Sequence, residues 1–442
     1  NRQYVLINLL EAPALAFVMA FFLRYRTTDH GAAGQYVFRH NDNIPQYLFI
    51  AVIVALFLGL TVAAEEIIRD RKILQREKFL SLSWSSYLVS KIGVLFSISA
   101  VQSFLFVLVG DLVLGMQGLL WEHWAVLFTT ACFANVLGLN VSASFNSAKV
   151  IYIMIPVLII PQLLFSGIIV RFDKLHPWFA SEKSVPWIGN IMASRWAYEA
   201  LAVAQFTDND YERLFYPFDQ RMKTANWKKD LWVRELKQRS DNVRRAVDAR
   251  TAGSPAVAQD LALVHTEMAK EVQGLKGLRF PDLELLDPAH VNATVLNELD
   301  STLEILTQHY RNTYKTAERS KEDRIAEMTA TPELRRNYFA LLDGSRNESL
   351  SDFVTNKNDV NLIVESNGEL VQKSDPIYVI PADGGFFTAQ FYAPVKQLFG
   401  TYMRTLAANI IFLWCMTLML ALALKFELFP RIGQRLASKT RQ

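Results

Sequence analysis

The residues best placed to do chemistry in this sequence lie in one charged stretch, Ala63 to Lys91, between two long apolar runs. This stretch holds the densest basic cluster between any two such runs, namely Arg69, Arg71, Lys72, Arg76, Lys78 and Lys91. Glu65 stands four residues before Arg69, the order that favours a helical ion pair. Apolar residues also recur at spacings that can share a helix face, which are Ile67, Ile68, Ile73 and Leu74. The pattern predicts a folded surface helix, which could contact a protein partner or rest on anionic lipid headgroups.

The elements that must position this stretch are predicted transmembrane helices. Six apolar runs are each about long enough to cross a bilayer, and they are Tyr4–Leu23, Pro45–Ala64, Ile92–Met116, Trp124–Ser144, Val150–Val170 and Leu406–Leu424. Basic residues in short loops mark the cytoplasmic side, so the charged stretch and both termini are expected to be cytoplasmic. The fold class predicted is therefore an all-α polytopic membrane protein with six transmembrane helices.

Three segments are expected along the chain. Residues 1–206 would hold the first five transmembrane helices, the cytoplasmic helix within 65–91, and outer re-entrant or interfacial helices over 171–206. Residues 207–395 would form an extracytoplasmic soluble domain, mainly helical with some β-structure, and residues 396–442 the sixth helix and a basic cytoplasmic tail. Within the soluble domain, Asn361–Lys373 predicts a β-hairpin around Asn367 and Gly368, and Asp375–Pro394 predicts strand or extended chain.

Composition excludes several classes of protein. The 442 residues are 51% hydrophobic and 20% charged with a net charge of +3, which gives no argument for nucleic-acid binding. The sequence contains no Walker A loop, no HExxH motif and no GxSxG elbow, so we assign no catalytic residue and no metal ligand. Both cysteines, Cys132 and Cys415, fall in apolar runs, so no disulfide framework is expected. Because residue 1 is Asn, we expect the sequence to be part of a longer chain.

Three stretches together resemble the membrane domain of ABC-2 type exporters, and specifically the G subfamily (White-like) of ABC transporters. They are IIRDRKILQREKFLSLSWSSYLVSKIGVLF, LLFSGIIVRFDKLHPW and ASRWAYEAL. The resemblance lies in their order and spacing, and it covers about Tyr4–Phe206 and the last predicted helix. The outer loop is longer here than is usual in the family, and it lacks the cysteines that often crosslink it in animal relatives.

The resemblance implies roles for named residues. Coupling to an ATPase would fall to Arg69, Arg71, Lys72, Arg76, Glu77 and Lys78, the outer gate or plug to Gly167, Ile168 and Ile169, the cavity lining to Phe57, Thr61, Tyr152 and Gln162, and a polar relay to Glu65 and Glu66. Three of these roles have a simpler alternative, which is a surface helix for the coupling set, ordinary helix packing for the plug, and solvated charges for the relay.

The function predicted is the permease domain of an ATP-driven exporter that moves a hydrophobic or amphipathic substrate outward. The expected partners are an ABC ATPase, fused or separate, a second permease copy, the lipid bilayer and a periplasmic protein, in a bacterial inner membrane. No cofactor is expected in this chain itself, and ATP and Mg²⁺ would bind the ATPase. The rival interpretations are a membrane-anchored envelope assembly or sensor protein and an intramembrane enzyme, the latter disfavoured because ionisable residues are nearly missing from the apolar runs.

Overall fold

The computed structural model describes residues 2–24, 36–77, 83–145, 147–181, 183–251, 253–381 and 385–431 of the chain, and it is mostly helical as predicted. The chain forms two compact units. Unit 1 comprises Asn1–Glu212, Ala340–Phe353 and Pro381–Gln442, and unit 2 comprises Arg213–Phe339 and Val354–Ile380.

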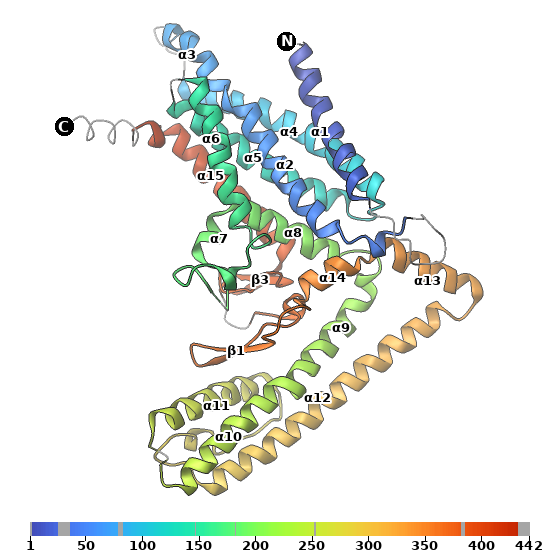
Figure 1. Cartoon of the computed structure of the whole chain (residues 1–442), viewed down its shortest axis with the longest axis vertical. Coiled ribbons are helices and arrows are strands. Elements are labelled where there is room, and N and C mark those ends of the chain that lie inside the picture. The colour runs from blue at the N-terminus through green and yellow to red at the C-terminus, as the bar shows by residue number, and fades with distance from the viewer. Residues whose placement is uncertain are drawn as a thin grey trace, which may run out of the picture. The chain divides into compact units, whose positions relative to one another are not determined.

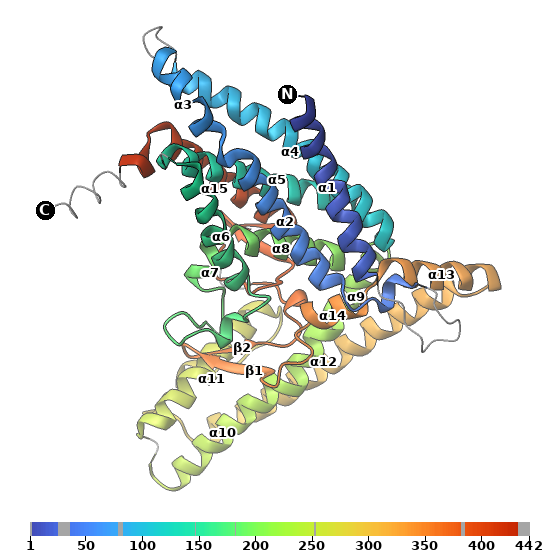
Figure 2. The same ribbon diagram turned by 45° about the horizontal axis from the view of Figure 1, so that its top comes forward.

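Unit 1 is built on the apolar helices of the chain (Figure 1). Its helices are α1 (Arg2–Leu23), α2 (Ile44–Ala64), α3 (Glu66–Glu77), α4 (Trp84–Leu114), α5 (Leu120–Ser144), α6 (Ala148–Leu164), α7 (Trp187–Ile191), α8 (Ala193–Thr207), α14 (Glu348–Val354) and α15 (Thr405–Lys425). It also contains the antiparallel hairpin of β3 (Val395–Leu398) and β4 (Thr401–Arg404) directly before α15. In both views α3 lies at one end of the bundle, the end at which α1 begins and α15 ends (Figure 2).

Helix α5 is the centre of this bundle and packs on α2, α4, α8 and α15. In its most apolar window 83% of residues are buried inside the structure, against 22% for α15. The close packing of α2 on α5 depends on Gly59 and Gly138. A Cβ at Gly59 would lie 2.6 Å from the carbonyl oxygen of Ala131, and one at Gly138 would lie 2.9 Å from the Cβ of Ala63. Small residues at such crossings allow helix backbones to approach closely.

Among the described residues, four helical segments are long and apolar enough to cross a membrane, namely Ile44–Arg71 (α2 taken together with the first part of α3), Trp84–Leu114, Leu120–Ser144 and Thr405–Lys425. Two shorter apolar helices, Leu9–Leu23 and Ala148–Leu164, fall on the predicted first and fifth spans. The count of six transmembrane helices therefore remains a prediction. The end of the charged stretch forms the start of α4, which Ser83 caps by accepting a hydrogen bond from the Ser86 backbone N–H at 3.5 Å.

Unit 2 is a helical unit with one small hairpin. It contains most of α9 (Glu212–Trp227), a π-helical turn (Lys228–Trp232), α10 (Val233–Asp248), α11 (Pro255–Gly274), α12 (Ala293–Met328) and the first part of α13 (Pro332–Ser345). Its core contains apolar residues from the buried faces of α10 and α11, among them Leu236, Val264 and Met268.

The predicted hairpin at Asn361–Lys373 is confirmed as β1 (Ile363–Ser366) paired with β2 (Glu369–Gln372). Asn367 and Gly368 form its turn with φ of 54° and 74°, values that favour these two residue types. Of the two outcomes expected for Asp375–Pro394, the strand is absent among its described residues, which contain the 3-10 turn Pro376–Tyr378.

Candidate functional site

The short helix α3 is fixed to the end of α5 by hydrogen bonds to its first turns. The backbone N–H groups of Ile67 and Ile68 both donate to the Ser142 hydroxyl oxygen at 3.1 Å. The Arg71 guanidinium donates to the carbonyl oxygens of Ala143 and Phe145 at 3.2 and 3.1 Å. The N-terminal N–H groups of one helix and the C-terminal carbonyls of another are thus both satisfied, and neither has a partner within its own helix.

An ion cluster ties the same helix to α4. The Lys91 ammonium lies 2.7 Å from a carboxylate oxygen of Glu66 and 2.7 Å from one of Asp70. The Tyr87 hydroxyl donates to Asp70 at 3.1 Å, and Arg69 pairs with Glu66 on the helix itself. Glu66 is buried and Lys91 is 22% exposed, so solvent screens this cluster less than it would an exposed pair.

The structure describes the side-chain contacts of some predicted coupling residues but not of others. Arg69 and Arg71 make the contacts just described, and Glu66 lies at the centre of the ion cluster, which makes it more than a solvated charge. Glu65 is half-buried at the junction of α2 and α3. Lys72, Arg76 and Glu77 belong to α3, but their side chains are outside the described part, and Lys78 is outside the described residues altogether.

Sequence reasoning missed Asp70 and Ser142 as members of this site. Asp70 stands four residues after Glu66, so both carboxylates share a helix face, and this spacing could have identified it. Ser142 lies near the end of an apolar run, where nothing in its local sequence indicates such a role. The Ser142 hydroxyl accepts hydrogen bonds from the N-terminus of another helix. Ser142 and Ile67 are 75 residues apart in the chain, so local sequence does not encode their contact.

The predicted gate residues form a tight turn after α6. Gly167 has φ of 85°, and a Cβ there would lie 2.5 Å from the ring of Phe172. Ile168 is half-buried, and its backbone N–H donates to the Ser166 hydroxyl at 3.4 Å. Ile169 is 57% exposed. The turn thus requires glycine at its first position and presents one aliphatic side chain outward.

We expect Gly167→Ala to lower the stability of unit 1 by about 1–3 kcal/mol, because alanine disfavours a positive φ and its methyl group would collide with Phe172. Gly93→Ala is the matched control, since a Cβ at Gly93 in α4 meets nothing within 4 Å. Thermal unfolding of the two purified variants in detergent measures the difference. Equal melting temperatures for both variants would contradict the strained turn.

The four predicted cavity residues occupy two kinds of position. Phe57 on α2 and Tyr152 on α6 are 43% and 53% exposed on the surface of unit 1. The Thr61 hydroxyl donates to the carbonyl oxygen of Phe57 at 3.0 Å. Gln162 is engaged within the chain, because its side-chain oxygen accepts from the Ser194 backbone N–H at 3.0 Å. The exposed side chains of Phe57 and Tyr152 are therefore free to line a cavity, whereas the hydrogen bond of Gln162 positions the start of α8.

A buried charged network, which sequence reasoning did not identify, joins α8 to the hairpin β3–β4 and to α15. Glu199 accepts from Lys396 at 2.5 Å and from the Asn409 amide at 2.8 Å, and Arg195 lies 3.3 Å from the same carboxylate. These charged side chains are at most 2% exposed. The sequence indicated that Arg195 and Glu199 stand one turn apart, but Lys396 comes almost 200 residues later and nothing local links it to them.

Two cations therefore share one carboxylate in this network. Burial and the neighbouring Arg195 charge lower the pKa of Lys396 to about 7. Burial alone would raise the pKa of Glu199, but Arg195 and Lys396 outweigh it and hold the pKa below its usual value. The Arg195 guanidinium also stacks 3.8 Å from the centre of the Trp196 ring. The arrangement is suited to holding three elements together, and no group in it is exposed to a substrate in solution.

The described residues contain no group of three or more His, Cys, Asp or Glu side chains that could hold a metal ion. The bundle of apolar helices, with an ion-paired helix docked at one end, defines an integral membrane protein. Residues 2–206 match the family model described as ABC-2 type transporter, so this segment is an ABC-2 type transporter membrane domain. Permease domains of this family normally work with an ATPase subunit. No curated protein matches the chain.

Proposed function

We propose that the chain is the permease component of an ATP-driven exporter of the ABC-2 type, similar to the G subfamily, and that it moves a hydrophobic or amphipathic substrate outward. The family match of residues 2–206 supports this proposal. The single observation that carries the mechanism is the attachment of α3, which is bonded to α5 through Ser142 and to α4 through Lys91. A helix held in this way moves together with two apolar helices.

In this mechanism α3 is the coupling helix. An ABC ATPase, fused or separate, contacts α3 on the cytoplasmic side and binds ATP with Mg²⁺. Its closure pushes α3, and the two attachments pass the displacement to α4 and α5. Because α2 packs closely on α5 through Gly59 and Gly138, α2 follows. The coupling set Arg69, Arg71, Lys72, Arg76, Glu77 and Lys78 then has two tasks, docking α3 on the membrane helices and contacting the ATPase.

The outer part of the pathway is assigned to the turn after α6. A second permease copy faces α2 and α6, so that the exposed side chains of Phe57 and Tyr152 line the cavity between the copies. The turn Gly167–Ile169 closes this cavity outward, with the exposed Ile169 side chain as the closing group. Unit 2 is then extracytoplasmic, where it could meet a periplasmic protein of a bacterial envelope.

A crosslinking experiment tests the assignment of α3. Ile73 is 53% exposed on α3, so a photoreactive amino acid placed there in native membranes is expected to form a covalent adduct with an ABC ATPase. The same amino acid at Leu112, which is 79% exposed at the far end of α4, is the matched control and is expected to label lipid only. ATPase adducts that form equally from both positions, or from neither, would remove α3 from the interface.

The second candidate is a membrane-anchored assembly or sensor protein whose outer domain binds a partner, and it is favoured by the size of unit 2. Such a protein has no need for a helix docked through Ser142 and Lys91. The crosslinking experiment separates the two candidates, because an anchor protein would yield no ATPase adduct from Ile73.

A further inference from the structure

The turn between α4 and α5 carries a buried pair of ionisable side chains that belongs neither to α3 nor to the gate turn. Asp111 stands in the last turn of α4 and His123 in the first turn of α5, and a carboxylate oxygen of Asp111 lies 3.0 Å from Nδ1 of His123. Both side chains are buried. The pair therefore joins the helices on either side of the turn, where solvent screens it little.

The other side of the His123 ring has no hydrogen-bond partner. Its Nε2 atom is buried and unpaired among the residues that the structure describes, and so is the side-chain oxygen of Gln205 on α8. The Gln205 side chain nevertheless lies within hydrogen-bonding reach of the His123 ring. The chain just beyond α8 meets the same turn at Gly118, where a Cβ would lie 3.2 Å from the Asp210 carboxylate. In a neutral ring whose Nδ1–H donates to Asp111, Nε2 is an acceptor, so two unpaired acceptors lie next to each other.

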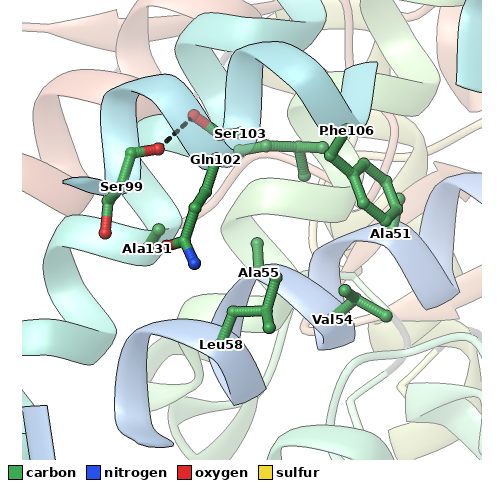
Figure 3. A pocket seen from close by; sticks show the side chains of 10 residues that line it. Ala51, Val54, Ala55, Leu58, Ser99, Gln102, Ser103, Phe106 and Ala131 are labelled. Atoms are coloured by element: carbon green, nitrogen blue, oxygen red, sulfur yellow. Dashed lines mark hydrogen bonds between the residues drawn. The ribbon is translucent and has the colours of Figure 1, made fainter. Parts of the chain in front are cut away.

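Several hydroxyl groups of this bundle avoid the same problem locally. In Figure 3 the Ser103 hydroxyl donates to the carbonyl oxygen of Ser99, one turn earlier on α4, at 2.7 Å. The Thr130 hydroxyl donates to the carbonyl oxygen of Val126 on α5 at 2.7 Å. A hydroxyl can turn towards a carbonyl of its own helix, whereas a ring nitrogen and an amide oxygen that are both acceptors need a proton between them.

One added proton would satisfy both acceptors. A ring that is protonated at Nε2 as well as Nδ1 is a donor at both nitrogens, so Nδ1–H bonds to Asp111 and Nε2–H bonds to the Gln205 oxygen. Hydrogen bonds from a charged donor are stronger than those from a neutral one. Histidine gains and loses its proton between about pH 5 and pH 8, and the proton is taken from water and returned to it.

The surroundings of the ring supply anions rather than competing cations. The titratable groups around the pair are Asp111 of α4, Glu122 of α5 and Tyr47 of α2. From α8 the neutral Gln205 faces the ring, and Asp208 at the end of that helix is paired with Arg404. A protonated His123 would therefore have a carboxylate partner beside it.

We propose that His123 is a proton-operated latch between α5 and α8. In the protonated state its ring bridges Asp111 on α4 and Gln205 on α8, and loss of the Nε2 proton to water breaks the second bond. Helix α8 also carries Glu199, which holds the β3–β4 hairpin and α15, so the latch sets how firmly these elements are attached to α5. The second bond belongs to the protonated form, so its stabilisation is present at low pH and is lost as the pH rises. The proposal does not depend on transport, because all three side chains belong to one chain.

Hydrogen exchange of the backbone amides, measured by mass spectrometry at about pH 5 and about pH 8, tests the latch. Gln205→Met keeps the length of the side chain but removes the acceptor. At about pH 5 we expect the amides of α8 to be protected about tenfold more in the unsubstituted protein than in this variant, and at about pH 8 we expect equal protection. The titration of Lys396 is common to both proteins, so the comparison isolates His123. Gln308→Met on the exposed surface of α12 is the matched control and should change protection at neither pH. The same ratio of protection at both pH values would overturn the proposal.

A second measurement uses the unsubstituted protein, so it stands even if Gln205→Met does not fold. His123 is the buried histidine among the described residues, so its ring N–H protons should exchange with water most slowly. Nuclear magnetic resonance of protein with nitrogen-15 histidine is expected to show two protected ring N–H groups at about pH 5 and one at about pH 8. One group at both pH values would mean that the Gln205 amide N–H donates to a neutral ring, and two groups at both would make His123 a fixed strut. Either result would contradict the latch.

Discussion

Glu199→Gln is expected to destabilise unit 1 by about 3–5 kcal/mol, the cost of breaking a buried ion pair by removing one partner. Glutamine keeps the size and part of the hydrogen bonding of glutamate, but it removes the carboxylate that Arg195 and Lys396 share. Arg195 would then be a buried cation without a counterion, and Lys396, whose pKa of about 7 is held up by Glu199, would have to release its proton. On the scale of a domain of this size, the melting temperature is expected to fall by on the order of 10 °C.

A comparison of Lys396→Met with Glu199→Gln tests the same network more sharply. Lys396→Met leaves Arg195 and Glu199 as a balanced pair, so this variant is expected to lose clearly less stability than Glu199→Gln. Glu322→Gln on the exposed surface of α12 is the matched control for loss of a carboxylate and should be neutral. A greater loss for Lys396→Met than for Glu199→Gln would contradict the assignment of two cations to one anion.

The network also predicts how stability varies with pH. The pKa of Lys396 is about 7 in the folded chain and 10.5 as its ordinary value, so the unfolded chain binds more protons between these limits. Stability from this group therefore rises as pH rises from 7 towards 10.5 and is lost as pH falls through 7. Melting curves across this range should show a smaller rise for Lys396→Met than for the unsubstituted protein.

Lys91→Met is expected to uncouple ATP hydrolysis from movement of the membrane helices in the assembled transporter. Lys91 bridges Glu66 and Asp70 on α3 from its place on α4. Loss of hydrogen bonds to charged groups costs on the order of 2 kcal/mol. A loss of that size shifts the equilibrium between docked and undocked α3 by more than tenfold. ATP hydrolysis should continue, because the ATPase carries its own catalytic residues, while ATP-driven opening of the gate should fall about tenfold.

Lys149→Met is the control for Lys91→Met. Lys149 lies on α6, is exposed, and has no ion pair among the described residues. The Lys149→Met variant loses the same positive charge as Lys91→Met, but it keeps the ion pairs that hold α3. If both variants retain full gate opening, Lys91 has no part in coupling, and if Lys91→Met also abolishes ATP hydrolysis, its effect lies in assembly of the complex.

Sequence reasoning was most accurate where the pattern is local. The helical content and the hairpin at Asn367 and Gly368 followed from spacing and turn chemistry. The charged helix was also predicted. These features depend on residues that are close together in the chain, which a single sequence does reveal.

The contacts that give the site its rigidity could not be predicted in this way. Ser142 meets Ile67 across 75 residues, and Lys396 meets Glu199 across 197. Both pairings arise only when α5 and the β3–β4 hairpin fold against other parts of unit 1. Gln162, which the resemblance assigns to the cavity lining, also accepts a hydrogen bond from the Ser194 backbone N–H across 32 residues, and local sequence does not predict that contact.

The most direct test of the account is the distance between gate turns in the assembled transporter. Spin labels attached at Ile169→Cys, in a protein whose Cys132 and Cys415 are replaced by alanine, report one distance between the two copies. The account predicts that trapping with ATP and vanadate lengthens the distance between the two labels when Lys91 is present. In the Lys91→Met protein, ATP hydrolysis should continue but the distance should no longer change. A distance that stays the same with and without trapped nucleotide, in a complex that hydrolyses ATP, would contradict the coupling of α3 to the gate.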